Sequence, residues 1–224
     1  MPEPTYLLVH GAWHGAWCWR DVAAELDRRR VPWRAVDLPS SRDPEGVRDL
    51  RDDAAAVVAL ADVGGPVVLV GHSYGGAVIA EAASRVPELA GLVYLAALVP
   101  RPGQSATDAS REVRVRTALD DATVVDGPLL RVRADGAAAA FYGDCSLADQ
   151  GWAVAQLSSQ TLASFRCPRQ EDDPPTPRRY VLCERDRAID PSLQDVMSAR
   201  CDEVVRLASD HSPFLSHPRE CVTA

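Results

Sequence analysis

The segment Val67–Ala83 constrains the fold most strongly, because an apolar strand passes into a helix there through one serine set between glycines. The apolar run Val67–Val70 ends at Gly71, Ser73 follows two residues later, and Gly75 begins a stretch with helical composition. Glycines on both sides of the serine let the strand and the helix approach without a clash between Cβ atoms. The G-x-S-x-G pattern recurs by chance, but between a strand and a helix it predicts a strained turn that presents the serine hydroxyl as a nucleophile at the helix N-terminus.

The segments around this turn alternate between predicted strands and helices. Continuous apolar strands that alternate with helices are typical of a parallel sheet covered on both faces, so we expect an α/β fold. Functional residues then belong at the carboxyl ends of the strands. We expect strands at 6–9, 33–36, 67–70 and 89–98, helices at 17–30, 46–61 and 75–85, and a polar loop over 40–45.

The stretch 101–177 breaks this alternation. It contains a predicted hairpin over 123–132, helices near 137–142 and 147–157, a short piece at 159–165 and a proline-rich connector over 172–177. The alternation resumes with strands at 179–183 and 203–207, a helix at 191–200 and a short last helix from Phe214 onward. We predict a core formed by residues 1–100 and 178–224, with a cap inserted at 101–177.

Composition excludes several classes of partner. A formal net charge of −8 argues against nucleic acid, and no apolar run approaches the ~18 residues that a membrane-spanning helix needs. The first residues lack the basic and apolar regions of a secretory signal, so we expect a cytoplasmic protein. Six cysteines form neither C-x-x-C nor zinc-type spacing, which predicts no metal site. Without an export signal we expect the cysteines to be free thiols in a reducing cytosol. We also expect no cofactor; the oligomeric state stays open, a homodimer included.

A serine nucleophile needs a base to take its proton. In a fold of this kind the acid and then the histidine follow the serine along the chain. His211 lies in a loop directly after the strand predicted over 203–207, and we expect it to be the base. His217 lies in the last helix and suits a surface position better.

The carboxylate that orients this base should follow the preceding strand. Asp186 lies in the loop before the next helix and is the favoured acid, while Glu184 and Asp190 remain alternatives. Asp190 also has the position of a helix N-cap, with Pro191 in the first turn. We expect Asp210, next to the base in sequence, to have a structural role.

An oxyanion hole needs two backbone N–H groups that point toward the charge developing on the carbonyl oxygen. One should belong to Tyr74, directly after the serine, and the other to the loop that follows the first strand. Ala12 is the predicted donor in that loop, beside His10 and Gly11.

Four segments together resemble the α/β-hydrolase superfamily, in particular the branch of plant methylesterases, hydroxynitrile lyases and bacterial pyrethroid-type carboxylesterases. The segments are Val9–Trp19, Gly71–Gly76, Cys183–Ile189 and Ser209–Leu215, and Phe141–Ser146 is similar as well. The resemblance implies the α/β-hydrolase fold, a triad of Ser73, Asp186 and His211, and Ala12 and Tyr74 as oxyanion donors. The chain ends soon after His217, where relatives usually continue a longer helix; this departure concerns the final helix and its packing and not the chemistry.

Two positions distinguish the reactions known in this branch. The lyases carry a threonine after the first histidine and a lysine after the catalytic one, whereas this sequence has Gly11 and Ser212. We therefore expect a serine carboxylesterase that hydrolyses a small, largely apolar ester. The alternatives are a lyase or cyclase-type enzyme of secondary metabolism and a non-hydrolytic protein that binds a small molecule. The residues expected to line the substrate pocket are Trp13, His14, Tyr142 and Trp152.

Overall fold

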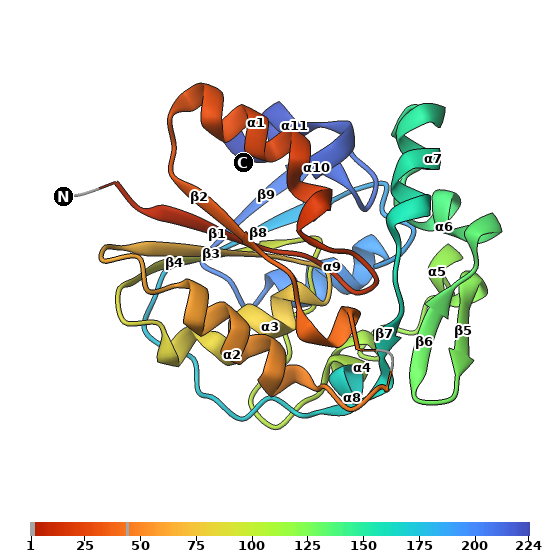
Figure 1. Cartoon of the computed structure of the whole chain (residues 1–224), viewed down its shortest axis with the longest axis horizontal. Helices are drawn as coiled ribbons and strands as arrows, with labels where there is room; N and C mark the ends of the chain where they lie inside the picture. Colours follow the sequence, from red (N-terminus) through yellow and green to blue (C-terminus); the bar gives the residue numbers. More distant parts are fainter. Residues whose placement is uncertain (1–2, 44) are drawn as a thin grey trace.

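The computed structural model describes residues 3–43 and 45–224, so Met1, Pro2 and Pro44, the last within the predicted polar loop, lie outside the described residues. A six-stranded parallel sheet with strand order β2-β1-β3-β4-β8-β9 forms the centre of the molecule (Figure 1). The strands are β1 (Thr5–Val9), β2 (Trp33–Val36), β3 (Val67–His72), β4 (Leu89–Leu95), β8 (Arg178–Cys183) and β9 (Glu203–Leu207).

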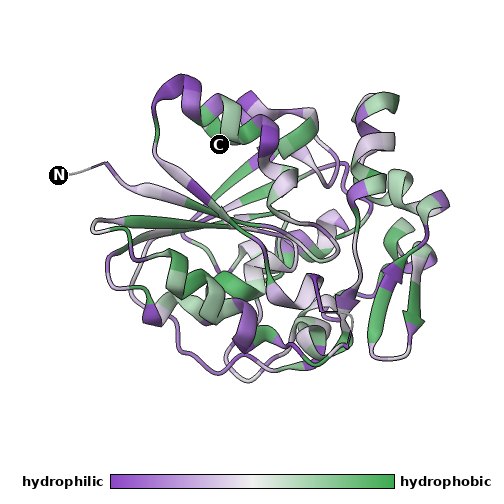
Figure 2. Cartoon of the chain, viewed as in Figure 1, coloured by the Kyte–Doolittle hydropathy of each residue, from purple (hydrophilic) through white to green (hydrophobic). Residues whose placement is uncertain are grey.

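Helices cover both faces of this sheet. In Figure 1, α1, α10 and α11 lie on one side of the sheet and α2 and α3 on the other. The apolar strands and the inner helix faces form one buried core. In Figure 2, hydrophobic green colours much of the central sheet and parts of α2 and α3. The predicted α/β fold, with a parallel sheet between helices, is therefore confirmed. The elements are α1 (Arg20–Arg29), α2 (Leu50–Leu60), α3 (Gly75–Ala82), α9 (Pro191–Ser198), α10 (Pro213–Ser216) and α11 (Pro218–Thr223), with 3₁₀ turns η1 (Ala16–Trp19), η2 (Pro39–Ser41) and η3 (Ala83–Arg85).

The elements between β4 and β8 form a separate, smaller arrangement beside the main sheet (Figure 1). Its antiparallel sheet has the order β5-β6-β7, and β5 and β6 form the predicted hairpin. The two-residue strand β7 and the five-residue helices α4 and α5 were not predicted from the sequence. The division at 101–177 remains a prediction. The elements are α4 (Ala106–Ser110), α5 (Ala118–Ala122), β5 (Thr123–Asp126), β6 (Leu129–Val132), α6 (Ala134–Phe141), α7 (Leu147–Gln156), β7 (Gln160–Thr161) and α8 (Leu162–Arg166).

Two predicted boundaries were wrong. The strand expected to reach Leu98 ends at Leu95, because Ala96 adopts a φ of 44° and turns the chain away from the sheet. The helix expected from about Gly46 begins only at Leu50, because the Asp49 side chain caps it there with a capping box.

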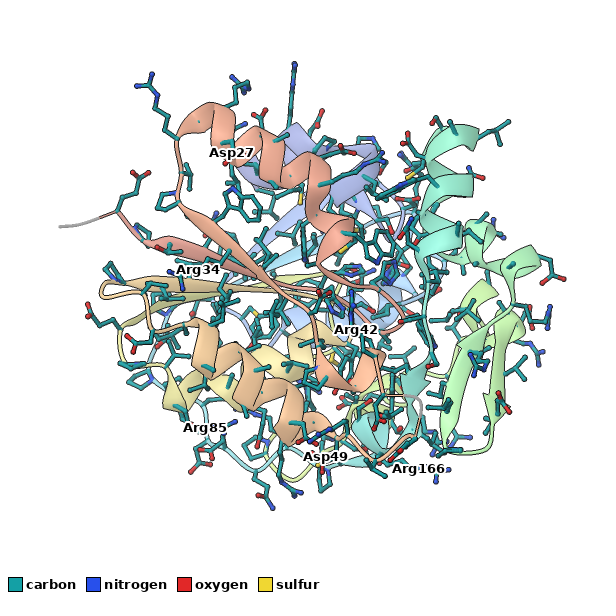
Figure 3. The ribbon with its side chains drawn as sticks, in the orientation of Figure 1. Asp27, Arg34, Arg42, Asp49, Arg85 and Arg166 are labelled. Carbon is teal, nitrogen blue, oxygen red and sulfur yellow. The ribbon has the colours of Figure 1, made fainter. Side chains whose placement is uncertain are left out.

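The outer surface carries charged side chains, among them the exposed Asp27, Arg34 and Arg85, which are labelled in Figure 3. Within 3–43 and 45–224, no helix combines the length and the apolar character needed to cross a bilayer. All six cysteines are free thiols.

Candidate active site

Ser73 occupies a tight turn between β3 and α3. Its φ is 55°, a left-handed value that costs free energy for a residue with a side chain, so the predicted strain is present. A Cβ added at Gly71 would lie 2.5 Å from the carbonyl oxygen of Gly75, and one at Gly75 would lie 2.6 Å from that of Val9. Strand and helix therefore approach each other closely only because both positions are glycine. The backbone N–H of Ser73 donates to the Leu95 carbonyl at 3.1 Å, which holds the turn against β4.

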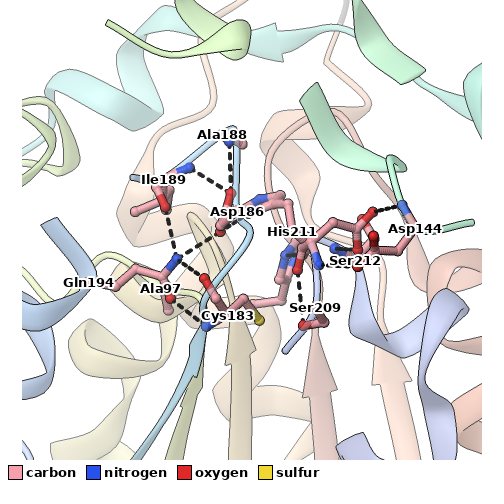
Figure 4. A network of polar contacts seen from close by, with 12 residues as sticks. Ala97, Asp144, Cys183, Asp186, Ala188, Ile189, Gln194, Ser209, His211 and Ser212 are labelled. Carbon is pink, nitrogen blue, oxygen red and sulfur yellow. Dashed lines mark hydrogen bonds and ion pairs between the residues drawn. The ribbon is translucent and has the colours of Figure 1, made fainter. Parts of the chain in front are cut away.

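Asp186 and His211 come together from the ends of the neighbouring strands β8 and β9. The His211 Nδ1–H donates to Asp186 Oδ2 at 2.7 Å, and both side chains are almost completely buried (Figure 4). The other oxygen, Oδ1, accepts from the backbone N–H groups of Ala188 and Ile189 at 2.7 and 2.9 Å. With its proton on Nδ1, the imidazole presents Nε2 as an acceptor, which is the state that a general base requires.

Gln194 is a site residue that the sequence analysis missed. From α9 its Nε2 donates to Asp186 Oδ2 at 2.9 Å and to the Ile189 carbonyl at 2.8 Å, while its Oε1 accepts from the Cys183 N–H at 3.0 Å (Figure 4). This amide joins the end of β8 to the loop that carries the acid. The signal in the sequence was a polar residue on the apolar face of the helix, three positions before Met197.

The rival carboxylates have other roles. Glu184 is exposed. Asp190 is the N-cap of α9 and accepts from the Ser192 N–H at 2.9 Å, as predicted. Asp210 accepts from the N–H groups of Asp144 and Ser212, so it ties the histidine loop to the segment before α7. Of the carboxylates considered from the sequence, Asp186 is the one in contact with the His211 ring.

His72 brings the serine turn and the histidine loop together. Its Nε2–H donates to the backbone carbonyl of His211 at 2.9 Å, and the two ring centroids are 4.5 Å apart. Burial lowers the pKa of His72 well below its usual value, so the ring is neutral. Ser73, the next residue, is thereby placed beside the histidine loop. Among the described residues no hydrogen bond joins the Ser73 hydroxyl to the His211 ring, and such bonds commonly tighten only when substrate binds.

The loop after β1 lies against the serine turn. Neither Ala12 nor Tyr74, the predicted oxyanion donors, uses its backbone N–H in a hydrogen bond within 3–43 and 45–224. A Cβ added at Gly11 would lie 2.9 Å from the Ser73 Cβ. His10 fixes this loop, because its Nδ1–H donates to the Gly11 carbonyl at 2.8 Å. Burial lowers the pKa of His10 to about 4, although that hydrogen bond opposes the shift, so the ring is neutral.

A cavity of about 490 Å³ opens beside Ser73. Apolar side chains from the main sheet and from the smaller arrangement line it. Residues of α4, of α5 and of the loop between these helices line it as well, and this loop carries Arg111 and Arg114, which no sequence motif indicated. Trp13 lines the cavity, as predicted for the pocket. Within 3–43 and 45–224, no group of three or more His, Cys, Asp or Glu residues is arranged to hold a metal ion.

The other three predicted pocket residues lie outside the lining of this cavity. The Tyr142 hydroxyl donates to His14 Nε2 at 2.7 Å, and the His14 Nδ1–H donates to the Ala12 carbonyl at 2.8 Å. Trp152 is half-buried and packs edge-on against Trp17, with ring centroids 5.3 Å apart. These side chains join the smaller arrangement to the loop after β1.

The chain is similar to known hydrolases over nearly its whole length. A family model described as "Alpha/beta hydrolase family" matches residues 6–224. Methylesterase 18 of Arabidopsis thaliana is 28% identical over 249 residues, which cover 98% of this chain and 95% of that protein. Norfluorocurarine synthase 2 of Strychnos nux-vomica is 27% identical over 251 residues, covering 97% and 92%. The crystal structure of a pyrethroid hydrolase from Sphingobium faniae JZ-2 has a TM-score of 0.86 at 26% identity, covering 98% of this chain and 94% of that one.

Proposed function

The chain belongs to the alpha/beta hydrolase family, as its four motifs predicted, and we propose that it is a serine carboxylesterase acting on a small, largely apolar ester. The observation that carries this proposal is the hydrogen bond between Asp186 and His211, formed at the ends of adjacent strands beside the strained Ser73 turn. A serine on a strained turn, together with an imidazole that a carboxylate orients, is the arrangement that activates serine as a nucleophile.

In the proposed reaction, His211 Nε2 takes the Ser73 proton as Oγ attacks the ester carbonyl. The oxyanion of the tetrahedral intermediate accepts hydrogen bonds from the N–H groups of Ala12 and Tyr74. The C–O bond to the alcohol then breaks, and His211 returns the proton to the departing alkoxide. Water repeats the sequence on the acyl-enzyme: His211 takes its proton, hydroxide adds to the acyl carbon, and the acid leaves as Ser73 regains the proton.

Positions 11 and 212 support hydrolysis over cyanohydrin cleavage. A Cβ added at Gly11 would lie 2.9 Å from the Ser73 Cβ, so a larger side chain at this position would displace the turn. Ser212 brings no cation that would stabilise a departing cyanide. Apolar side chains, including Trp13 and Leu98, form part of the cavity lining, which favours an apolar acyl or alcohol group. The proposed ligand is thus a small neutral ester, with neither nucleic acid nor membrane as a partner.

The relative named norfluorocurarine synthase favours a second candidate, a lyase or cyclase-type reaction that uses the same histidine without an acyl-enzyme. Stopped-flow hydrolysis of p-nitrophenyl acetate and p-nitrophenyl butyrate separates the two. We expect a burst of p-nitrophenol close to one equivalent, followed by turnover, and neither in Ser73→Ala. Cyanide release from mandelonitrile without ester turnover would favour the lyase, and ester turnover that is equal in Ser73→Ala would refute the esterase mechanism.

A further inference from the structure

A buried polar network that the proposed reaction does not use centres on Asp53 of α2. Asp53 is 0% exposed. Its Oδ1 accepts from the Ser40 N–H at 2.9 Å, and its Oδ2 accepts from the Ser40 hydroxyl at 2.5 Å and the Tyr74 hydroxyl at 2.7 Å. No arginine pairs with this carboxylate in the part of the chain that the structure describes. A buried carboxylate without a cation is costly, so its retention calls for a reason other than stability.

We propose that Asp53 is a positioning residue for the oxyanion hole, holding Tyr74 directly and the Ala12–Trp13 segment through a hydrogen-bonded relay. This inference rests on the proposed function, because it takes the N–H groups of Ala12 and Tyr74 as the oxyanion donors.

The first arm of the network holds Tyr74. The hydroxyl of this tyrosine is bound to Asp53, and its ring stacks on Phe165 with centroids 5.1 Å apart. The side chain is thus fixed at its tip and along its face, and it is 1% exposed. The backbone N–H of Tyr74 lies directly after the strained Ser73 and has no intramolecular acceptor among the described residues. Anchoring the side chain restricts rotation of the peptide plane that carries this N–H.

The second arm reaches the loop after β1 through Gln160 of β7. The Gln160 Nε2 donates to the hydroxyls of Ser40 and Ser164 at 2.6 and 2.7 Å. Its Oε1 accepts from the Trp13 N–H at 3.4 Å. Trp13 has a φ of 64°, so this segment is held in a conformation that it would not adopt freely. The preceding residue, Ala12, carries the second oxyanion donor.

The direction of the hydrogen bonds explains why position 53 is a carboxylate. Gln160 donates to Ser40, Ser40 donates to Asp53, and Tyr74 donates to Asp53 from the other side. Only a group that accepts at every lone pair satisfies both hydroxyls and the Ser40 N–H; an asparagine would turn an NH₂ toward one of them. Burial raises the pKa of Asp53 to about 6, and the hydrogen bonds from Ser40 and Tyr74 oppose the shift, so the ionised form is retained at neutral pH.

Tyr74→Phe in the full-length chain tests the first arm, because it keeps the backbone N–H and the ring and removes only the hydroxyl. Removal of a whole oxyanion donor typically lowers kcat by about 10²–10³-fold. For a donor that is loosened and not lost, we expect kcat for p-nitrophenyl butyrate to fall about tenfold, with KM changed less than about twofold. The matched control is Tyr94→Phe: Tyr94 is fully buried and its hydroxyl has no partner in the described part of the chain. We expect this variant to keep wild-type kcat.

A trifluoromethyl ketone supplies a readout that a merely structural role would not move. Ser73 Oγ adds to the ketone carbon, its proton passes to His211, and the carbonyl oxygen becomes an alkoxide in the oxyanion hole. We expect Tyr74→Phe to weaken inhibition by this ketone by the same factor as kcat, and to leave binding of the parent methyl ketone within about twofold. Asp53→Asn should lower kcat and weaken ketone inhibition at least as much as Tyr74→Phe does. The double variant should be no worse than Asp53→Asn alone.

Two outcomes overturn the inference and differ in what else they overturn. If the wild-type protein hydrolyses the ester but Tyr74→Phe and Asp53→Asn both keep wild-type kcat and ketone inhibition, Asp53 does not position the oxyanion hole and the esterase proposal stands. If the wild-type protein neither turns over esters nor forms the ketone adduct, the proposed function fails and the role of Asp53 fails with it.

Discussion

Replacement of Asp186 by asparagine is the substitution whose effect the structure specifies most fully. The carboxylate accepts four hydrogen bonds: two backbone N–H groups reach Oδ1, and His211 and Gln194 reach Oδ2. An asparagine keeps an oxygen for the backbone pair, but its NH₂ then faces two donors. His211 relieves the clash only by moving its proton to Nε2, and in that tautomer it no longer accepts the proton of Ser73.

The magnitude follows from this tautomer exchange. The wrong tautomer removes general-base catalysis, and the same change in a chymotrypsin-type triad lowers kcat by about 10⁴-fold. Here Gln194 also loses its charged acceptor and adds to the misorientation of the imidazole. We therefore expect Asp186→Asn to lower kcat by about 10³–10⁴-fold, equivalent to about 4–5.5 kcal/mol of transition-state stabilisation.

The assay is the steady-state hydrolysis of p-nitrophenyl butyrate, with Glu184→Gln and Asp190→Asn as matched controls. Glu184 is exposed and Asp190 serves as a helix N-cap, which asparagine also fills, so both controls should stay within about threefold of wild type. Circular dichroism should show that all three variants are folded. If Asp186→Asn kept more than a tenth of wild-type kcat, or if either control lost a hundredfold, the identification of the acid would be wrong.

Three further predictions concern the surroundings of the site. Gln194→Met removes the amide that orients Asp186; we expect kcat to fall about 10–100-fold and the free energy of unfolding to fall by about 1–3 kcal/mol, and wild-type values in steady-state kinetics and urea denaturation would contradict the assigned role. Gly11→Ala puts a Cβ 2.9 Å from the Ser73 Cβ; we expect at least a tenfold loss of kcat and a lower melting temperature, and an unchanged enzyme in both assays would show that the turn yields easily. Stability should fall on acidification, because buried neutral histidines whose pKa values lie below 6.5 in the folded state gain protons on unfolding as the pH drops from about 6.5 toward 4. The raised pKa of Asp53 acts in the opposite sense between about 4 and 6 but is a single group. The free energy of unfolding should therefore be lower at pH 5 than at pH 7.5, by about 2 kcal/mol for each histidine before the opposing contribution of Asp53. The urea midpoint should fall with it, and an equal or higher midpoint at pH 5 would contradict this. The histidines are His10, His14 and His72, with folded pKa values of about 4, about 3 and well below the usual value.

The parts of the site that follow a strand were predictable from the sequence. The Ser73 turn, Asp186 and His211 each follow a predicted strand within a few residues, and the carboxyl ends of parallel strands meet at one edge of the sheet. Their positions in the chain therefore suffice to bring them to the same edge. Gln194 was missed, because its contacts depend on how α9 packs against the loop that precedes this helix, and a glutamine in a short helix carries no motif.

Contacts between segments far apart in the chain could not be predicted from the sequence either, because they also depend on how the elements pack. The hydrogen bond from His72 to the His211 carbonyl joins residues that are 139 positions apart. In the sequence Asp53 is one of several acidic residues near the start of α2, and only the hydrogen bond from the Tyr74 hydroxyl and the burial of the side chain distinguish it. The helices α4 and α5 are five residues each, too short for apolar periodicity to reveal them.

The central claim is that the Ser73 hydroxyl is the nucleophile of this protein. Intact-protein mass spectrometry after incubation with a fluorophosphonate tests it most directly, because the reagent phosphonylates an activated serine. We expect one adduct per chain on the wild-type protein, located by peptide mapping to Ser73, and none on Ser73→Ala under the same conditions. Stoichiometric labelling of Ser73→Ala, or no labelling of the folded wild-type protein, would contradict the claim.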